Sequence, residues 1–418
     1  MKLITNPFNE TIYQWQTPSQ MTVLLVHKPE FVNQAVGVGT TLSGLTSTID
    51  LNGERLTLKP GLAHFLEHQL FESDAGSIMN DFTEVGASVN AYTSYHETVY
   101  YFATTNSLKK PLHLLMDMMV DAKLTKQSVQ KEKGIIIQEL AMYEQMPEAR
   151  LIRETFANLY ENHPLKFDIG GSAESVSATE LKDLMQAYDL FYNPKNLVMV
   201  IVSHHPIATL KNWVLEHPLS HKTNRGHHLK TRRTWEPLVE TSKIKSTIMD
   251  ITQNKVIVSV PLLPETAEAD SLLVRWGLRV LLESHFSEMN PDYQTWLDAG
   301  TINALFDYDV DVEADYGHVL FLFENIDHHD ARAFVIRELQ KLSITQAQLE
   351  QLKKRWFFAS LRVFNNPSSI MLRLLHYHLK TRSYFDLLHI LNDLSLADVK
   401  AAQRFLADVV HVTEIKGR

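Results

Sequence analysis

The sequence predicts two mixed α and β domains in one chain, and three observations support this prediction. The chain has 418 residues, more than one typical hydrophobic core accommodates. Strand-like and helix-like segments alternate through the first 205 or so residues, and a polar stretch then interrupts them. From about residue 244 the order of strand, long helix and strand resumes. A duplicated domain is therefore expected, although identity between the halves is not evident.

The elements of the first half begin with two strands. The apolar segments 21–28 and 35–44 are expected to be neighbouring strands, and 61–72 is expected to be a helix because its apolar residues recur at helical spacing. Residues 86–105 are rich in Val, Thr and Tyr, which is typical of one long bent strand or of two strands joined near His96. The remaining predicted elements are helices at 108–121, 127–146, 148–162 and 178–191 and a strand at 197–204.

Residues 206–243 break this alternation, since they are polar, basic and without periodicity. We therefore predict an N-terminal domain over 1–210, a linker over 211–243 and a C-terminal domain over 244–418. The linker is rich in histidine (His217, His221, His227 and His228), but a solvated loop accounts for it better than a metal site. In the second half, strands are expected at 255–263 and 318–325, with a long helix at 269–286 between them and mainly helices over 346–408.

Composition and charge exclude several classes of protein. A net charge of −9 argues against a dedicated nucleic-acid-binding protein. The apolar runs are too short to span a membrane, so no membrane span is predicted. The first residues lack the pattern of a targeting segment, which makes a cytoplasmic location the expectation. With no cysteine, any transition metal must be bound by histidine nitrogens and carboxylates.

The segment GLAHFLEHQLFE, residues 61–72, contains the pattern of a hydrolytic zinc site. His64 and His68 are four residues apart, so both imidazoles can reach one ion from the same helix face. Glu67 lies on that face, where its carboxylate can take a proton from the attacking water. This is the H-x-x-E-H arrangement of inverzincins. The alternative is three polar residues on a solvated helix face, but apolar residues on both sides favour a partly buried cluster.

A third ligand is predicted from the segment QKEKGIIIQELAMYEQMPE, residues 130–148. Glu132 and Glu139 are seven residues apart and therefore project from one helix face. Glu139 is suited to be the third ligand, and Glu132 to be a supporting carboxylate that accepts a hydrogen bond from a ligand or from the water. Because three isoleucines precede Glu139, we expect this helix to be largely buried apart from that face. A solvated pair of glutamates is the alternative.

These segments, with GASVNAYTSYHETVYYF and HPLKFDIGGSAESVSATELKDLMQAYDLFYNPKNLVMVIVS, resemble the pitrilysin and insulin-degrading-enzyme family of inverted zinc peptidases. The resemblance is strongest to short bacterial members similar to mitochondrial processing peptidase. It implies one Zn²⁺ per chain held by His64, His68 and Glu139, with Glu67 as general base and Glu132 as a supporting catalytic glutamate. The interval from His68 to Glu139 is slightly short for the family, so we expect a trimmed loop between residues 72 and 90.

The resemblance also implies the fold class, the binding mode and the partners. It implies an α+β fold of two similar domains, each a mostly antiparallel sheet with helices packed on one face. It implies peptide or unfolded substrates that bind as an added strand, with Asn90 and Ala91 at the substrate-contacting positions. Two such domains form half of the family's closed chamber, so a homodimer, or a heterodimer with a second family member, is expected.

One departure from the family lies in the second half. Active relatives carry an assisting arginine and tyrosine there, but residues 291–311 contain no arginine. Leu297 and Asn303 stand about where the pair is expected, with Tyr293 or Tyr308 as the nearest substitutes. The predicted function is a zinc-dependent endopeptidase that uses a metal-bound water as nucleophile. The alternatives are a non-catalytic or partner-dependent subunit of a processing peptidase and, less favoured, a metal-storage module.

Overall fold

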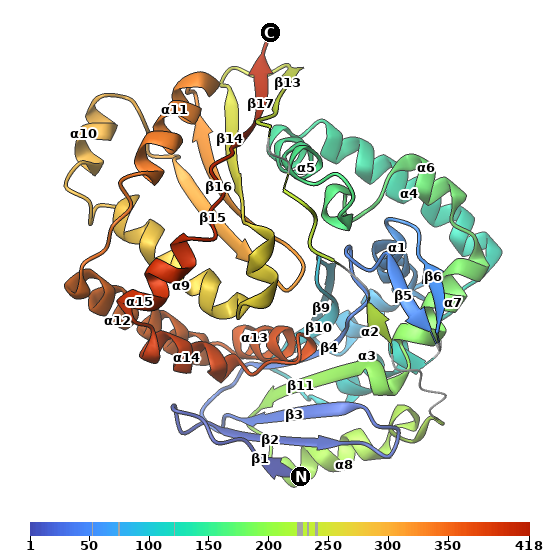
Figure 1. The fold of residues 1–418 in the computed structure, drawn as a ribbon. Helices are drawn as coiled ribbons and strands as arrows, with labels where there is room; N and C mark the ends of the chain where they lie inside the picture. The colour runs from blue at the N-terminus through green and yellow to red at the C-terminus, as the bar shows by residue number, and fades with distance from the viewer. Residues whose placement is uncertain (52, 74–75, 121, 224–228, 232–233, 239–240) are drawn as a thin grey trace. The chain divides into compact units, whose positions relative to one another are not determined.

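The computed structural model describes residues 1–51, 53–73, 76–120, 122–223, 229–231, 234–238 and 241–418. The chain folds as two compact units whose segments interleave along the sequence (Figure 1). Unit 1 comprises Met1–Leu140, Asp168–Arg232 and Ala359–Asp386, and unit 2 comprises Ala141–Phe167, Arg233–Phe358 and Leu387–Arg418. The contiguous ranges 1–210, 211–243 and 244–418 remain a sequence-based prediction of domains, and the boundary after residue 210 falls inside a helix, α8 (Ile207–Glu216).

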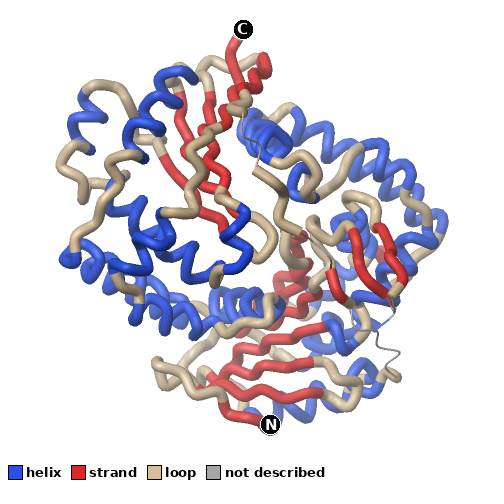
Figure 2. Tube along the Cα trace, viewed as in Figure 1, coloured by secondary structure: helices blue, strands red, loops and turns tan. Residues whose placement is uncertain are grey.

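Unit 1 is built on a seven-stranded sheet with the order β1-β2-β3-β11-β4-β10-β9. Figure 2 shows the strands of the chain in red and the helices in blue. Its strands are β1 (Lys2–Leu3), β2 (Thr11–Gln16), β3 (Thr22–His27), β4 (Gln34–Thr40), β9 (Ala87–Thr93), β10 (Thr98–Thr104) and β11 (Leu197–Ser203). Only the β3–β11 pair is parallel. Two small sheets add β12 (Lys230–Thr231), β5 (Thr48–Leu51) and β6 (Glu54–Thr57), and β7 (Glu72–Ser73) with β8 (Gly76–Ser77).

Unit 2 repeats the same topology with five strands. Its sheet has the order β13-β17-β14-β16-β15, in which only β13 and β17 are parallel. The strands are β13 (Ile244–Met249), β14 (Lys255–Pro261), β15 (Asp307–Val312), β16 (Gly317–Glu324) and β17 (His411–Gly417). In the unit 1 sheet the last strand, β11, lies between β3 and β4, and β9 forms the edge. In the unit 2 sheet the last strand, β17, lies in the same way between β13 and β14, and β15 forms the edge. The predicted fold class, two similar α+β domains with mostly antiparallel sheets, is therefore confirmed.

Two predictions about strands are settled by the sheet order. Residues 21–28 and 35–44 do form strands, but they are not neighbours, because β11 inserts between β3 and β4. The sequence of each segment indicated a strand. It did not indicate the shared partner, β11, which follows about 160 residues later in the chain. Residues 86–105 form two strands, β9 and β10, which pair as an antiparallel hairpin around Ser94–Glu97.

The helices cover the sheets and account for most of the rest of the chain. In unit 1 they are α1 (Leu62–Gln69), α2 (Ile78–Glu84), α3 (Lys109–Val120), most of α4 (Lys126–Glu144), α6 (Ala173–Ala178), α7 (Leu181–Phe191), α8 and α13 (Pro367–Leu379). Those wholly or mainly in unit 2 are α5 (Pro147–Leu159), α9 (Ser271–His285), α10 (Tyr293–Asp298), α11 (His328–Leu339), α12 (Gln346–Arg362), α14 (Tyr384–Asp393) and α15 (Leu396–Gln403). No helix within the described ranges is long and apolar enough to cross a membrane. The segment between residues 72 and 90, expected as a trimmed loop, contains the β7–β8 hairpin and α2.

Each unit contains one helix from the other half of the sequence. Helix α13 packs on β4 and β11, where Gly37 and Gly39 allow a close approach. A Cβ built on Gly37 would lie 2.3 Å from Met371 Sδ, and one on Gly39 would lie 2.4 Å from a methyl carbon of Leu375. In unit 2, α5 packs on β14 and β17. One helix therefore covers the second face of each sheet. The sequence-based prediction had placed helices on one face only.

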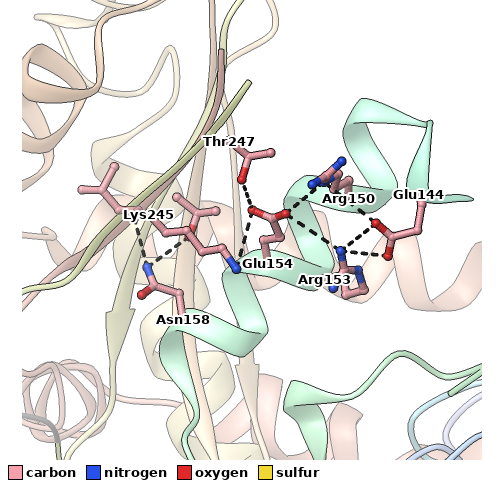
Figure 3. A network of polar contacts seen from close by, with 9 residues as sticks. Glu144, Arg150, Arg153, Glu154, Asn158, Lys245 and Thr247 are labelled. Atoms are coloured by element: carbon pink, nitrogen blue, oxygen red, sulfur yellow. Dashed lines mark hydrogen bonds and ion pairs between the residues drawn. The ribbon is translucent and has the colours of Figure 1, made fainter. Parts of the chain in front are cut away.

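Polar contacts fix α5 to its sheet (Figure 3). The buried Glu154 accepts hydrogen bonds from Thr247 Oγ1 at 2.7 Å and from Arg150 Nε at 2.9 Å. Burial raises the pKa of this carboxyl, but the bonds to Thr247 and Arg150 outweigh burial and lower it. One turn further, Asn158 Nδ2 donates to the carbonyl of Val412 at 3.0 Å. The carboxylate is therefore satisfied in its buried position, which lets a charged residue lie against the sheet.

The expectation of a solvated histidine-rich loop is wrong for His217. This side chain is only 4% exposed, and its Nε2 lies 3.0 Å from Asp117 Oδ1. It caps a 3₁₀ turn (Pro218–His221) that directly follows α8. The helical pattern of α8 covers only a few turns, and basic residues follow it closely. For this reason the sequence of this segment did not indicate a helix. His227 and His228 lie outside the described residues.

The stability of unit 2 is expected to fall as the pH drops below about 6.5. His318 on β16 is buried, and its Nδ1 lies within hydrogen-bond distance of Tyr160 Oη, at 2.8 Å. Burial and, to a smaller extent, the charge of Arg275 lower the pKa of His318 to about 3. Between pH 6.5 and about 3, His318 is protonated in the unfolded chain, where its pKa is ordinary, but it stays neutral in the folded protein. This group should thus lower the free energy of unfolding by about 1.4 kcal/mol per pH unit well below pH 6.5.

Thermal unfolding followed by circular dichroism between pH 7.5 and 5 tests this prediction. The His318→Gln variant should lose stability less steeply with acid than the wild type. Parallel slopes for the two proteins would contradict the assignment.

Candidate metal centre

Helix α1 places three polar residues on its half-exposed side. Leu62, Ala63, Phe65, Leu66 and Gln69 are buried in the core of unit 1, and His64, Glu67 and His68 are left on the other side. The helix begins after Gly61, whose φ of 84° is unfavourable for other residues. A Cβ on Gly61 would also lie 2.3 Å from the carbonyl oxygen of Gly170. Glycine at this position therefore sets the direction in which α1 leaves the loop.

Helix α4 contributes the two glutamates from a single buried stripe. Val129, Glu132 and Ile136 are buried, and Glu139 is half-buried next along the same face. The expectation that this helix is largely buried is wrong, since Ile135 is 42% exposed. The isoleucine run spans more than one face of a helix, and only one of those faces meets the core. Glu132 and Glu139 nevertheless project together, as their spacing predicted.

His64, His68 and Glu139 bring one potential ligand atom each to within 4.8 Å of one another. Glu139 Oε2 lies 3.4 Å from His68 Nε2 and 3.8 Å from His64 Nε2. A tetrahedron with metal–ligand bonds of about 2.0–2.1 Å has edges of about 3.3–3.4 Å. The distance to His68 Nε2 matches such an edge, and the distance to His64 Nε2 is about 0.4 Å longer, so a small closure of the side chains would place the three atoms around one tetrahedral ion. The set of two imidazoles and one carboxylate suits Zn²⁺.

The surroundings of the two histidines differ. Burial and the charge of His68 lower the pKa of His64 to about 4, so its imidazole is neutral and able to bind a metal at pH 7. Its Nδ1 is buried and has no hydrogen-bond partner among the described residues. Burial lowers the pKa of His68, but hydrogen bonds to Glu132 and Glu139 outweigh it and raise that pKa to about 9. His68 therefore binds a metal only after its ring loses a proton.

Glu132 lies behind His68, on the opposite side from Glu139. Its Oε1 accepts a 2.9 Å hydrogen bond from His68 Nδ1, which leaves Nε2 directed toward Glu139. A carboxylate in this position fixes the tautomer and the ring orientation of a metal-binding histidine. The two glutamates of α4 therefore occupy different positions, one among the ligand atoms and one behind them.

Glu67 lies beside this cluster and is held by Thr93, the last residue of β9. Thr93 Oγ1 donates a 2.7 Å hydrogen bond to Glu67 Oε2. Burial raises the pKa of Glu67, and the bond from Thr93 opposes that rise. A carboxylate with a raised pKa is better matched to taking a proton near neutral pH. Thr93 was not among the predicted site residues, although its place close to Asn90 and Ala91 in the same strand was a possible signal.

Asn90 and Ala91 lie in β9, an edge strand of the sheet whose one partner among the described residues is β10. Asn90 is exposed, and its Oδ1 accepts a 2.8 Å hydrogen bond from the backbone N–H of Ala91. Because Thr93 on the same strand bonds Glu67, this free edge runs past the proposed general base. The edge can therefore accept an extended chain close to the cluster on α1.

The residues that stand in place of the assisting pair have structural contacts in unit 2. Leu297 and Tyr293 pack against its core, and Asn303 Nδ2 donates a 2.6 Å hydrogen bond to the carbonyl of Glu324. Burial raises the pKa of Tyr308 far above its ordinary value, so this hydroxyl stays protonated. These four side chains hold the fold of unit 2.

The chain is similar to a known protein family and to a bacterial protein. Residues 57–172 match the insulinase family, peptidase family M16. The chain is 29% identical, over 399 residues, to an uncharacterized zinc protease, YmfH, of Bacillus subtilis (strain 168), covering 94% of this chain and 92% of that protein.

Two solved structures share the fold. The crystal structure of an M16-like peptidase from Alicyclobacillus acidocaldarius has a TM-score of 0.89 at 22% identity and covers all of both chains. A peptidase M16 inactive domain from Pseudomonas fluorescens has a TM-score of 0.76 at 16% identity, covering 97% of this chain and 98% of that one. At these identities the likeness establishes the fold alone.

Proposed function

We propose that this chain is a zinc-dependent endopeptidase, because residues 57–172 match the insulinase family, peptidase family M16. The observation that carries the proposal is the spacing of His64 Nε2, His68 Nε2 and Glu139 Oε2 around one ion-sized position, with Glu67 beside it. The name of the similar Bacillus protein, a zinc protease, supports the choice of metal.

The chain's own groups have separate roles in this proposal. His64, His68 and Glu139 hold one Zn²⁺. Zinc in such a site lowers the pKa of a water and polarises the scissile carbonyl. The Glu67 carboxylate, which Thr93 orients, would accept a proton from the attacking water and donate it to the leaving amine. Glu132 keeps the His68 ring in position through its Nδ1.

Replacing Glu132 with glutamine is expected to lower zinc affinity by roughly 10- to 100-fold without removing a ligand. The amide can still accept a hydrogen bond from His68 Nδ1, but it lacks the charge that makes the imidazole a stronger donor to the metal. Competition with a chromophoric chelator measures the affinity. The exposed Glu144, on the same helix, supplies the control variant Glu144→Gln. Equal affinities for Glu132→Gln and the control would contradict the positioning role.

We further propose that the substrate pairs with β9 as an added strand. Main-chain hydrogen bonds at the free edge, including the N–H of Ala91 once Asn90 releases it, would provide affinity that depends little on side chains. Peptides N-methylated at alternate backbone amides are expected to separate into two groups. Methylation should raise KM at amides that face β9 and have little effect at those that face away. A uniform response along the peptide would exclude strand addition.

Cleavage of a mixed library of unstructured peptides tests the function as a whole. The purified, zinc-loaded chain should cleave the library, and the Glu67→Gln variant should not. If the purified chain is active without a second protein, the proposed assembly is a homodimer. Light scattering of the same sample measures the oligomeric state and tests this.

A second function is favoured by two observations, the absence of arginine from residues 291–311 and the fold shared with a peptidase M16 inactive domain. This alternative is a non-catalytic or partner-dependent subunit of a heterodimeric processing peptidase. It predicts that the zinc-loaded chain binds peptides but cleaves none alone. Cleavage that is lost in Glu67→Gln would exclude it.

A further inference from the structure

A second group of potential metal ligands lies in unit 2, at the start of α11. Asp327, His328 and His329 each bring one ligand atom to within 4.8 Å of the others. The two imidazole rings lie with their centroids 4.0 Å apart. Asp327 Oδ1 accepts the backbone N–H of His329 at 2.8 Å, and the backbone N–H of Asp330 also bonds this carboxylate. A carboxylate has about four acceptor positions, so it can bind an ion as well. The arrangement supplies two nitrogens and one oxygen, but exposed groups of this kind are common without a metal.

A buried carboxylate behind His328 distinguishes this group from an ordinary surface cluster. Glu414, on β17, is 1% exposed, and its Oε2 lies 3.4 Å from His328 Nδ1. Ser246 Oγ donates to that oxygen at 2.9 Å. Among the described residues, neither Glu414 Oε1 nor His328 Nδ1 has a hydrogen-bond partner. A carboxylate withdrawn from water in this way requires compensation by a positive charge or further donors.

We propose that Asp327, His328 and His329 bind a divalent transition-metal ion, for which Zn²⁺ is the test ion, through a carboxylate oxygen of Asp327 and one imidazole nitrogen of each histidine. His328 Nδ1 faces Glu414, so its Nε2 is the nitrogen assigned to the metal. Glu414 then receives the Nδ1–H, the relation that Glu132 has to His68 in unit 1. The bound ion places a positive charge close to this buried carboxylate.

The local charges are consistent with a cation at this position. The N-terminus of α11 is positive and by itself repels cations. Three carboxylates oppose it, those of Asp327 and Asp330 at the helix start and that of Glu414 beneath. Histidine nitrogens with one carboxylate select zinc, copper or nickel over magnesium and calcium. Such an ion would hold three side chains at the start of α11 together, with Glu414 of β17 behind one of them. This site is independent of the proposed peptidase centre.

Zinc titration of the full-length protein, after chelator treatment and with bound metal measured by equilibrium dialysis, tests the proposal. The wild type should bind two equivalents, and His329→Ala should bind one. His389→Ala, which removes an exposed histidine from α14, should still bind two. Glu139→Ala should retain the equivalent in unit 2, and adding His329→Ala to it should abolish binding. Failure of the peptidase centre therefore gives a different result from failure of this site.

Two further measurements guard against misfolding and adventitious binding. Glu414→Gln is expected to weaken the second equivalent by roughly 10- to 100-fold while His329→Ala keeps a wild-type circular dichroism spectrum. Peptidase activity of His329→Ala should equal that of the wild type. A single equivalent in the wild type, or a second equivalent that survives in His329→Ala, would overturn the proposal.

Discussion

The Glu67→Gln variant is expected to keep its zinc and to lose roughly 10²- to 10⁴-fold or more in kcat/KM. Glutamine preserves the shape of the side chain and can still accept the hydrogen bond from Thr93, but it cannot take a proton. The proposed ligand atoms belong to other residues, so the metal content should not change. Peptide cleavage and metal analysis of the same preparation give both quantities.

The matched control for this variant is Glu84→Gln. Glu84 is an exposed glutamate on α2 of the same unit. Its replacement by glutamine makes the same chemical change at a position outside the cluster. It should leave both zinc content and kcat/KM unchanged. Hydrolysis retained in Glu67→Gln would show that another group accepts the proton, and loss of zinc would show that Glu67 is a ligand.

The parts of the site that the sequence predicted are those set by helix geometry. His64, Glu67 and His68 share one face because of the turn of a single helix, and Glu132 and Glu139 share another for the same reason. The spacing could not show which glutamate approaches the histidines, because that depends on how α4 crosses α1. The structure places Glu132 against His68 Nδ1 and Glu139 against the Nε2 atoms.

The parts that the sequence did not predict depend on contacts between distant segments. Nothing near residues 21–44 indicates that β11 will insert between two strands that follow each other in the chain. The exchange of α5 and α13 is likewise invisible in periodicity, because an amphipathic helix pattern does not specify the sheet it covers. Thr93 was missed because one hydroxyl in a threonine-rich strand has no local signal of its own.

The Glu139→Ala variant is expected to lose one equivalent of zinc per chain and, with it, peptidase activity. Removal of a ligand should lower affinity by more than the roughly 10- to 100-fold that changes behind a ligand produce. The remaining imidazoles would offer two donors where a hydrolytic zinc site needs three. Gln138→Ala, at an exposed neighbouring position of α4, should keep both the metal and the activity.

This experiment also separates the two glutamates of α4. If Glu132 were the third ligand, its hydrogen bond to His68 Nδ1 would have to break, and the ring would have to turn. Full zinc binding in Glu139→Ala, together with loss in Glu132→Gln, would require that rearrangement and would contradict the assigned ligands. Loss in Glu139→Ala with only weakened binding in Glu132→Gln fits the observed geometry, in which one carboxylate faces the Nε2 atoms and the other holds the ring.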